Sequence, residues 1–487
     1  MFFLIEHVIS IVLVLLIGVG VATALMVGTA IQRRQVRDRY FRRLDDLREK
    51  FGPIITGIVE GRVEYAQGVQ ALQGLGGRDR LLMLERLCLE KRTTPEQLPV
   101  LRRLCEDLGL VEVWQKLLSG ERKDPEARRR LADANGFLLY RLGRLDFLVR
   151  AKCAENLGVI RHQPSWTLLV KALEDRHPDV RAVAVHALAM LGEPQSFPAL
   201  LSRLHSVVTE PQTILSLRTV KTAVVSFPLG TASQLLPSLS HQHRRVRYLA
   251  TDVIREMVER EAAGKDGFVL SAAVFPAALA EAFLNQLPVD SNPDVRARAA
   301  PVIAYLEGTR PIAVLLNLLE DKEWFVRLHT VRALAKSRFT RQVDEIARRL
   351  TDTHWMVREA AVHALVYLGQ LERLYDDFLR TPDRYSQEQI ADEWQRAGVI
   401  PVLLQRYAQA TGGQEMQVLG RLVQMSKTSY MLATLEIRGE TGLRRKFVQD
   451  FGRSPDPQIQ LWVRGLAETS VDAELRALAR SLVPPRG

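Results

Sequence analysis

Residues 319–334 read LEDKEWFVRLHTVRAL, and residues 350–365 repeat the same template as LTDTHWMVREAAVHAL. A third copy, LEDRHPDVRAVAVHAL, occupies residues 173–188. Each copy has Leu-x-Asp, four further residues, Val-Arg, and then small or apolar residues four, seven and eight positions after the valine. This spacing puts the apolar residues on one face of a helix, so the sequence predicts a recurring helical unit.

The distance between copies gives the size of the unit. The repeated valine recurs after 31 residues, after 66 where a degenerate copy lies between two clear ones, and after 49 where an insertion separates Val246 from Val295. A period of thirty-odd residues with helical apolar spacing is typical of a helix–turn–helix pair. Alternating strand-like runs with hairpin turns do not occur, so we expect an all-α fold. The repeated positions are Val149, Val180, Leu217 (degenerate), Val246, Val295, Val326 and Val357.

Over residues 141–371 these copies resemble HEAT repeats, including the HEAT-like repeats of phycobilisome lyases. The resemblance implies an α-solenoid of stacked HEAT-like helix pairs whose second helices line the inner face. Residues 53–140 lack the signature and are expected to form a helical cap or diverged repeats. Residues 372–487 contain a fainter echo, so a helical region with degenerate repeats is expected there.

The N-terminus predicts one transmembrane helix. Residues 7–32 contain no formal charge at pH 7, and the apolar run from Ile9 to Ile31 is long enough to cross a bilayer. A cleaved signal peptide would need a basic start and a shorter apolar core, whereas Glu6 is the charged residue that precedes this run. The expected segments are a short extracytoplasmic tip at 1–8, the membrane helix at 9–32 and a basic juxtamembrane helix at 33–52.

Arginines after the span predict its orientation. Six follow the apolar run and none precedes it, which by the positive-inside rule places the body in the cytoplasm and the arginines against lipid headgroups. An arginine-to-lysine ratio of 55 to 12 is typical of a GC-rich bacterial genome, so a bacterial inner membrane is expected. The six are Arg33, Arg34, Arg37, Arg39, Arg42 and Arg43.

Small residues recur within the span at Gly20, Ala24 and Gly28. A spacing of four clears one helix face for a second helix, which predicts self-association through the membrane helix. Small residues are also common in membrane helices in general, so an incidental origin stays open.

Composition excludes several classes of protein. With 47% hydrophobic and 25% charged residues, 22 prolines and 30 glycines, the chain is neither disordered nor of low complexity. Three cysteines (Cys88, Cys105, Cys153) are too few for a disulfide framework and contain no CxxC pair. The sequence has no phosphate-binding loop, HExxH or GxSxG motif, and it lacks the His-Glu pairs of iron-binding HEAT-type hydroxylases. We expect no metal, cofactor or catalytic residue.

The Asp and Arg of each template allow two interpretations. They are an anion-binding ladder, or they join neighbouring helices as the corresponding positions of HEAT repeats do. We favour the structural role, because an arginine held by a carboxylate has few donors left for a ligand. The pairs are Asp175/Arg181, Asp321/Arg327 and Asp352/Arg358.

One position changes character from unit to unit while the core positions stay apolar. It lies six residues after the repeat valine, and we call it the +6 slot. We predict that it faces away from the core and binds a protein partner, because a mixed polar stripe suits a protein better than a polyanion. The slot holds Glu155, His186, Asp252, Pro301, Arg332 and His363.

Trp324 and Trp355 each lie two residues before a repeat valine, where other units have Pro178 and Pro293. Proline suits the first turn of a helix, whereas tryptophan needs a cover for its large ring. The rings are expected to pack on neighbouring turns along one edge of the solenoid. A contact patch for the partner is the alternative.

The function expected from these features is that of a membrane-tethered scaffold, not an enzyme, that mediates protein–protein interaction on the cytoplasmic face. The alternative is an enzyme resembling the HEAT-like bilin lyases, for which no chemical constellation is found. A HEAT-like nucleic-acid-binding protein is a further alternative, but a net charge of +11, concentrated in the first half of the chain, is weak for that role.

Overall fold

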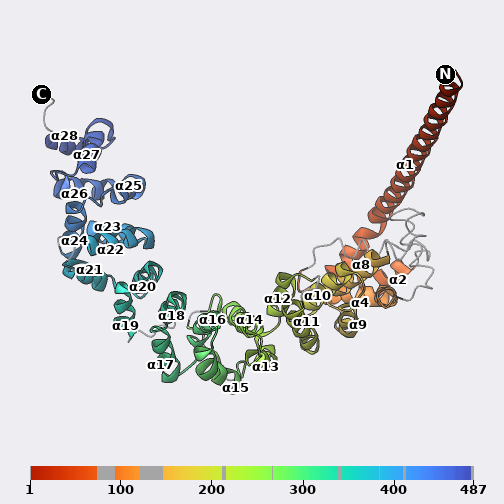
Figure 1. The fold of residues 1–487 in the computed structure, drawn as a ribbon, viewed down its shortest axis with the longest axis horizontal. Coiled ribbons are helices and arrows are strands. Elements are labelled where there is room, and N and C mark those ends of the chain that lie inside the picture. Colours follow the sequence, from red (N-terminus) through yellow and green to blue (C-terminus); the bar gives the residue numbers. More distant parts are fainter. Residues whose placement is uncertain are drawn as a thin grey trace. The chain divides into compact units, whose positions relative to one another are not determined.

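A computed structural model describes residues 2–73, 94–120, 146–210, 215–265, 267–271, 273–336, 342–382, 384–409 and 413–483. Within these ranges every regular element is a helix, which confirms the all-α prediction. The chain divides into two compact units, residues 1–231 and 232–487. Figure 1 shows the helices following one another along the chain in each unit. The predicted repeat region, 141–371, contributes to both units.

The first unit begins with one very long helix and continues with shorter ones. Short 3-10 turns lead into α9 and α11. The helices are α1 (Phe2–Val59), α2 (Tyr65–Gln73), α4 (Leu98–Asp107), α5 (Leu110–Leu118), α8 (Asp146–Val159), α9 (Trp166–Ala172), α10 (Pro178–Leu191), α11 (Phe197–Thr209) and α12 (Leu217–Val225).

The second unit is a succession of helices without a dominant long one. Its members are α13 (Leu236–Leu239), α14 (Arg244–Ala262), α15 (Ala277–Glu281), α16 (Pro293–Ile303), α17 (Thr309–Leu318), α18 (Trp324–Lys336), α19 (Val343–Arg348), α20 (Trp355–Tyr367), α21 (Leu371–Arg380), α22 (Arg384–Ala397), α23 (Val399–Gln409), α24 (Gln414–Gln424), α25 (Ser429–Arg438), α26 (Thr441–Phe451), α27 (Pro457–Thr469) and α28 (Ala473–Leu482). A π-turn at Ala282–Gln286 extends α15.

Each template copy forms the second helix of a pair. The copy at Val326 is α18, preceded by α17, and the copy at Val357 is α20, preceded by α19. In both copies the repeat valine and the residues four, seven and eight positions after it are buried, as the periodicity predicted. Second helices of successive repeats pack directly against one another, α14 on α16, α16 on α18 and α18 on α20. Burial of this apolar face is what holds the row together.

The slot two residues before the valine is the first residue of its helix. Pro178 begins α10, Pro293 begins α16, Trp324 begins α18 and Trp355 begins α20. The preceding residue caps the helix where the sequence allows it: the His177 ring nitrogen, for example, accepts a hydrogen bond from the backbone N–H of Asp179. The prediction that this slot lies in a first turn is confirmed.

Helix α1 joins the apolar N-terminus to the first packed residues without a break. It runs through the predicted boundaries near residues 8, 32 and 52, and ends where Phe51, Ile55 and Ile58 are buried. Pro53 lies inside this last part. The apolar part and the start of the folded body are therefore one continuous helix.

Candidate functional site

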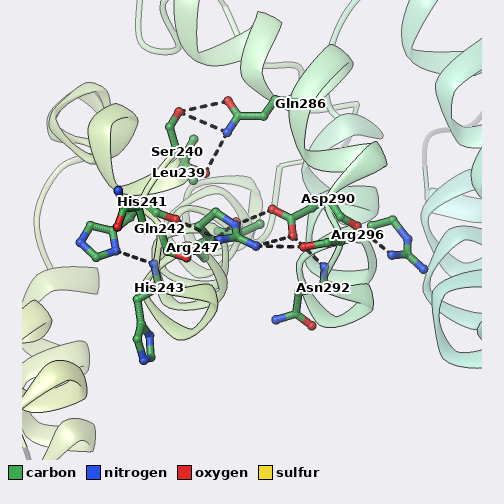
Figure 2. Close-up of polar contacts among 12 residues, drawn as sticks. Leu239, Ser240, His241, Gln242, His243, Arg247, Gln286, Asp290, Asn292 and Arg296 are labelled. Atoms are coloured by element: carbon green, nitrogen blue, oxygen red, sulfur yellow. Dashed lines mark hydrogen bonds and ion pairs between the residues drawn. The ribbon is translucent and has the colours of Figure 1, made fainter.

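The repeated arginine bridges neighbouring repeats. In Figure 2 the guanidinium of Arg247 donates hydrogen bonds of 2.7 and 2.9 Å to both carboxylate oxygens of Asp290. The same guanidinium donates to the backbone carbonyl of His241 in its own repeat. We call this set the Arg–Asp ladder. Its pairs are Arg150–Asp175, Arg247–Asp290, Arg296–Asp321 and Arg327–Asp352, and Arg358–Glu393 occupies the next position.

The aspartates of the ladder accept hydrogen bonds from the backbone as well as from the arginines. An oxygen of Asp321 accepts the backbone N–H of Glu323 at 2.9 Å, in addition to its two bonds from Arg296. Burial alone would raise the pKa of Asp321, but these hydrogen bonds outweigh it and hold the pKa below its usual value. The ladder is thus a set of joints between repeats, as the structural interpretation of the sequence predicted.

The +6 slot lies mostly at the surface of the second helices. Glu155, His186, Arg332 and His363 are exposed. Asp252 departs from the prediction, because it is only 3% exposed and its carboxylate holds Arg255 and Arg298 at 2.8 and 3.2 Å. It supports the surface from below and is not available to a partner.

Four consecutive second helices of the second unit, α14, α16, α18 and α20, line a pocket of about 440 Å³. Three +6 residues, Pro301, Arg332 and His363, are among its walls. The other wall residues lie three, seven, nine or ten positions after the repeat valine, or on α14, and were not predicted. They include Arg255, Glu259, Arg298, His329, Ala333, Lys336, Ala360, Ala364 and Tyr367. Helical periodicity from the +6 slot, extended by one turn in both directions, would have identified them.

The basic residues of the pocket differ in how many acidic partners they have. Arg255 contacts Asp252, Glu256 and Glu259 and is neutralised by them. Lys336 lies 3.9 Å from the carboxylate of Glu259. Arg332 makes no ion pair or hydrogen bond with any residue in the part of the chain that the structure describes. The mouth of the pocket therefore carries surplus positive charge on α18.

His329 lies among these cations. Burial lowers the pKa of His329 to about 4, and the charges of Arg298, Arg332 and Arg255 act in the same direction. The ring is therefore neutral at physiological pH, and it offers the pocket a hydrogen-bonding group without a further charge.

Both tryptophans lie near the ring of His354. Trp324 stacks on His354 with ring centroids 4.0 Å apart and an interplanar angle of 5°. Trp355, which is 44% exposed, has its ring centroid 6.2 Å from that of His354, and Arg396 lies 5.2 Å from the Trp355 ring. Neither tryptophan lines the pocket. They form an edge stack, and a role in binding a partner stays a prediction.

The N-terminal helix contains a segment, Leu15–Gln32, that is long and apolar enough to cross a membrane, with a mean hydropathy of 1.9 and no buried residue. A signal sequence would satisfy the same criteria. Gly20, Ala24 and Gly28 are exposed, and a Cβ at either glycine would contact nothing within 4 Å. The face predicted to approach a second helix is therefore unobstructed, and its use stays a prediction.

The arginines after this segment are on α1. Arg34 and Arg42 are exposed, and Arg34 lies 3.9 Å from Asp38. The side chains of Arg33, Arg37, Arg39 and Arg43 are outside the described part of the structure, as is Cys88. Cys105 and Cys153 are buried.

Among the described residues, no group of three or more His, Cys, Asp or Glu side chains is placed to hold a metal ion. No curated protein matches the chain at a significant level. The family model of HEAT repeats matches residues 135–210 and 280–366. The described helices of both segments have the fold of stacked HEAT-like pairs. The first segment contains one pair of the Arg–Asp ladder and the second contains two, together with most of the residues that line the pocket.

Solved structures resemble the chain at low identity. Importin beta is 12% identical, with 92% of this chain and 64% of that chain covered and a TM-score of 0.37. The complex of CpcE and CpcF of phycocyanin lyase from a Nostoc species is 15% identical (59% and 94% covered, TM-score 0.21). Human deoxyhypusine hydroxylase is 16% identical (59% and 98% covered, TM-score 0.22). The likeness carries no argument about function.

Proposed function

We propose that the chain is a membrane-tethered scaffold of HEAT repeats that binds a protein partner on the second helices of its second unit, on the cytoplasmic side of the membrane. The observation that supports this is the pocket on α14, α16, α18 and α20. The valine and the ladder arginine recur in these helices, whereas the pocket positions three and six residues after the valine differ from helix to helix. A pocket that gathers such differing polar and apolar residues favours recognition of a specific partner over a purely structural role.

We infer binding and not catalysis from the chemistry of the walls. A guanidinium such as that of Arg332 only donates hydrogen bonds, and the ring of His329 stays neutral at physiological pH, so these groups are suited to hold a ligand and poorly suited to exchange protons with it.

Site-specific photocrosslinking in cells tests the surface. A benzophenone amino acid at His363, on the pocket wall, is expected to give a discrete crosslinked product. The matched control carries the probe at Asn317, which is exposed on α17, a first helix. Equal products from both positions, or a product from Asn317 alone, would contradict the proposed surface.

The proposed anchor rests on the Leu15–Gln32 segment and on the arginines that follow it. Alkaline carbonate should leave the full chain in the membrane pellet, and a fluorescent protein fused after Gly487 should fold and fluoresce in the cytoplasm. A mature protein that lacks the first thirty-odd residues by mass spectrometry would identify a signal sequence instead.

Self-association through α1 is part of the same proposal. Replacing Gly20 and Gly28 together with isoleucine should weaken dimerisation in a membrane-helix reporter, because the added side chains keep the second helix away. Val21→Ile serves as the control for the change in bulk. An unchanged signal in the double variant would mean that this face does not pair.

A further inference from the structure

We propose that the pocket on α14, α16, α18 and α20 binds a short acidic peptide segment of the partner, with a peptide carboxylate on Arg332 and an apolar peptide side chain over Ala360 and Ala364. This rests on the proposed function, which it deepens by stating the chemistry of the partner. Three features of the pocket support it: the position of the unsatisfied charge, the chemistry of the remaining lining and the volume.

The cationic part of the pocket is centred on Arg332. Lys336 follows it by one turn on the same helix, and Arg298 comes from the preceding repeat. Arg298 already shares Asp252 with Arg255, while Arg332 has no partner among the described residues. An arginine with its donors unused prefers a planar carboxylate that accepts two hydrogen bonds.

The rest of the lining is largely apolar and contains small residues. It includes Ala333 on α18, Ala360 and Ala364 on α20, and Pro301 on α16. Tyr367 is 64% exposed at the edge, where its ring can cover a bound apolar group. A ligand that carried only negative charge would make no use of the accessible apolar lining, which is chiefly Pro301 and Tyr367.

Acidic groups in and under the pocket argue against a polyanion. Glu259 is part of the wall and Asp252 lies beneath it, so a nucleic acid or a polyphosphate would meet two fixed carboxylates. A volume of about 440 Å³ lies in the ordinary range of ligand pockets and suits a few residues of peptide. A segment that alternates acidic and apolar residues matches both the cationic residues and the apolar residues of the lining.

The test uses the full chain in detergent on an array of hexapeptides that combine Asp or Glu with Leu, Phe or Tyr. Matched peptides carry Asn or Gln in place of the acids, and a single-stranded oligonucleotide serves as the polyanion probe. Acidic–apolar peptides are expected to bind at least about tenfold more tightly than their amide counterparts, because a charge-assisted bond to Arg332 is lost in the latter.

Variants make the test specific. Arg332→Glu should abolish binding of acidic peptides and shift the preference towards Lys- and Arg-containing ones. Arg380→Glu is the control, because Arg380 is highly exposed on α21, outside the pocket. Thermal unfolding of both variants should match that of the unchanged protein, since both side chains are at the surface. The inference is overturned by equal binding of acidic and amide peptides, by equal losses in both variants, or by binding of the oligonucleotide alone.

The outcome is separable from that of the proposed function. A crosslinked partner at position 363 together with an indifferent peptide array would overturn this inference and leave the scaffold proposal standing. Acidic peptides that bind through Arg332 without any crosslinked partner would support the pocket chemistry and contradict the scaffold proposal.

Discussion

The repeats of the two units have the same Arg–Asp pairs between neighbouring repeats, but the repeats that contain Arg150 and Arg327 carry different residues on their exposed face. Arg150–Asp175 in the first unit and Arg327–Asp352 in the second have the same 2.7 Å contact, and each is accompanied by an aromatic–histidine stack, Phe147 on His177 and Trp324 on His354. The +6 residues differ: Glu155 in the first unit bonds Lys152, whereas Arg332 in the second is unpaired among the described residues. The template residues therefore determine how neighbouring repeats stack, whereas the +6 slot, which lies outside the core and the ladder, is free to differ between repeats.

The largest expected effect comes from breaking a joint. Asp321→Ala and Asp175→Ala each leave a buried arginine without its carboxylate and should lower the free energy of unfolding by about 3–5 kcal/mol. The losses should be similar in the two units if the joints are equivalent. Hydrogen exchange of α16 and α18, or of α8 and α10, reports the loss locally, which matters because a repeat array need not unfold in two states. A tolerated change in one unit only would show that the joints are not equivalent.

A pH effect is expected in the second unit. The pKa of His329 in the folded protein, about 4, lies below its unfolded value near 6.5, so the unfolded chain binds the proton more readily between these values. The contribution of this ring is therefore complete above pH 6.5 and falls by up to about 3 kcal/mol as the pH is lowered to 4. His329→Gln should flatten the decline in melting temperature across this window. A variant that declines as steeply as the unchanged protein would contradict the assignment.

A tight contact distinguishes the first unit. A Cβ on Gly158 of α8 would lie 2.7 Å from the Cα of Ala187 on α10, a backbone atom that cannot move aside easily. The equivalent position in the second unit is Ala335. Gly158→Ala should destabilise by about 1–3 kcal/mol through overpacking, and Ala335→Gly by about 1 kcal/mol through lost helix propensity. Guanidinium unfolding measures both, and a stabilising Gly158→Ala would mean that the two helices can separate without loss.

The smallest expected effects concern the edge stack. Trp324→Ala removes a ring stacked on His354 and should lower the free energy of unfolding by about 2 kcal/mol. Trp355→Ala should lower it by less than about 1 kcal/mol, because Trp355 is 44% exposed. Melting temperatures measure the difference. A larger loss for Trp355→Ala would reverse the assigned order, and a loss of the partner crosslink in that variant alone would assign Trp355 to the contact patch.

The sequence predicted the structure correctly at positions where a residue type is restricted to one place in a helix. The valine and its apolar companions predicted the buried face, and Pro178 and Pro293 predicted the first turn, because both follow from helix periodicity and backbone restriction. It was less informative about pairing. The template groups Asp175 with Arg181, yet the carboxylate of Asp175 binds Arg150 of the previous repeat, and Arg181 donates to the Asp175 carbonyl. Which repeat supplies the partner depends on how helices stack, which no local pattern contains.

The pocket illustrates the same limit. The +6 slot identified Arg332 and His363, but Arg298 and Lys336 lie on different turns and converge only when α16 and α18 are side by side. The burial of Asp252 was missed for a related reason, since Arg255 and Arg298 reach it from two helices.

Helix α1 has a mechanical consequence for the proposed anchor. Between Gln32, the end of its membrane-compatible segment, and Phe51, which is buried in the body, lie 18 helical residues, which span about 27 Å at 1.5 Å per residue. In the proposed anchor this stretch would act as a spacer that holds the packed end of α1 away from the headgroups unless the helix tilts. Pro53, which lacks a backbone N–H for the helix, lies between the buried residues Phe51 and Ile55, so a bend at this point would disturb their packing. The spacer and the packed end of α1 would therefore move as one piece.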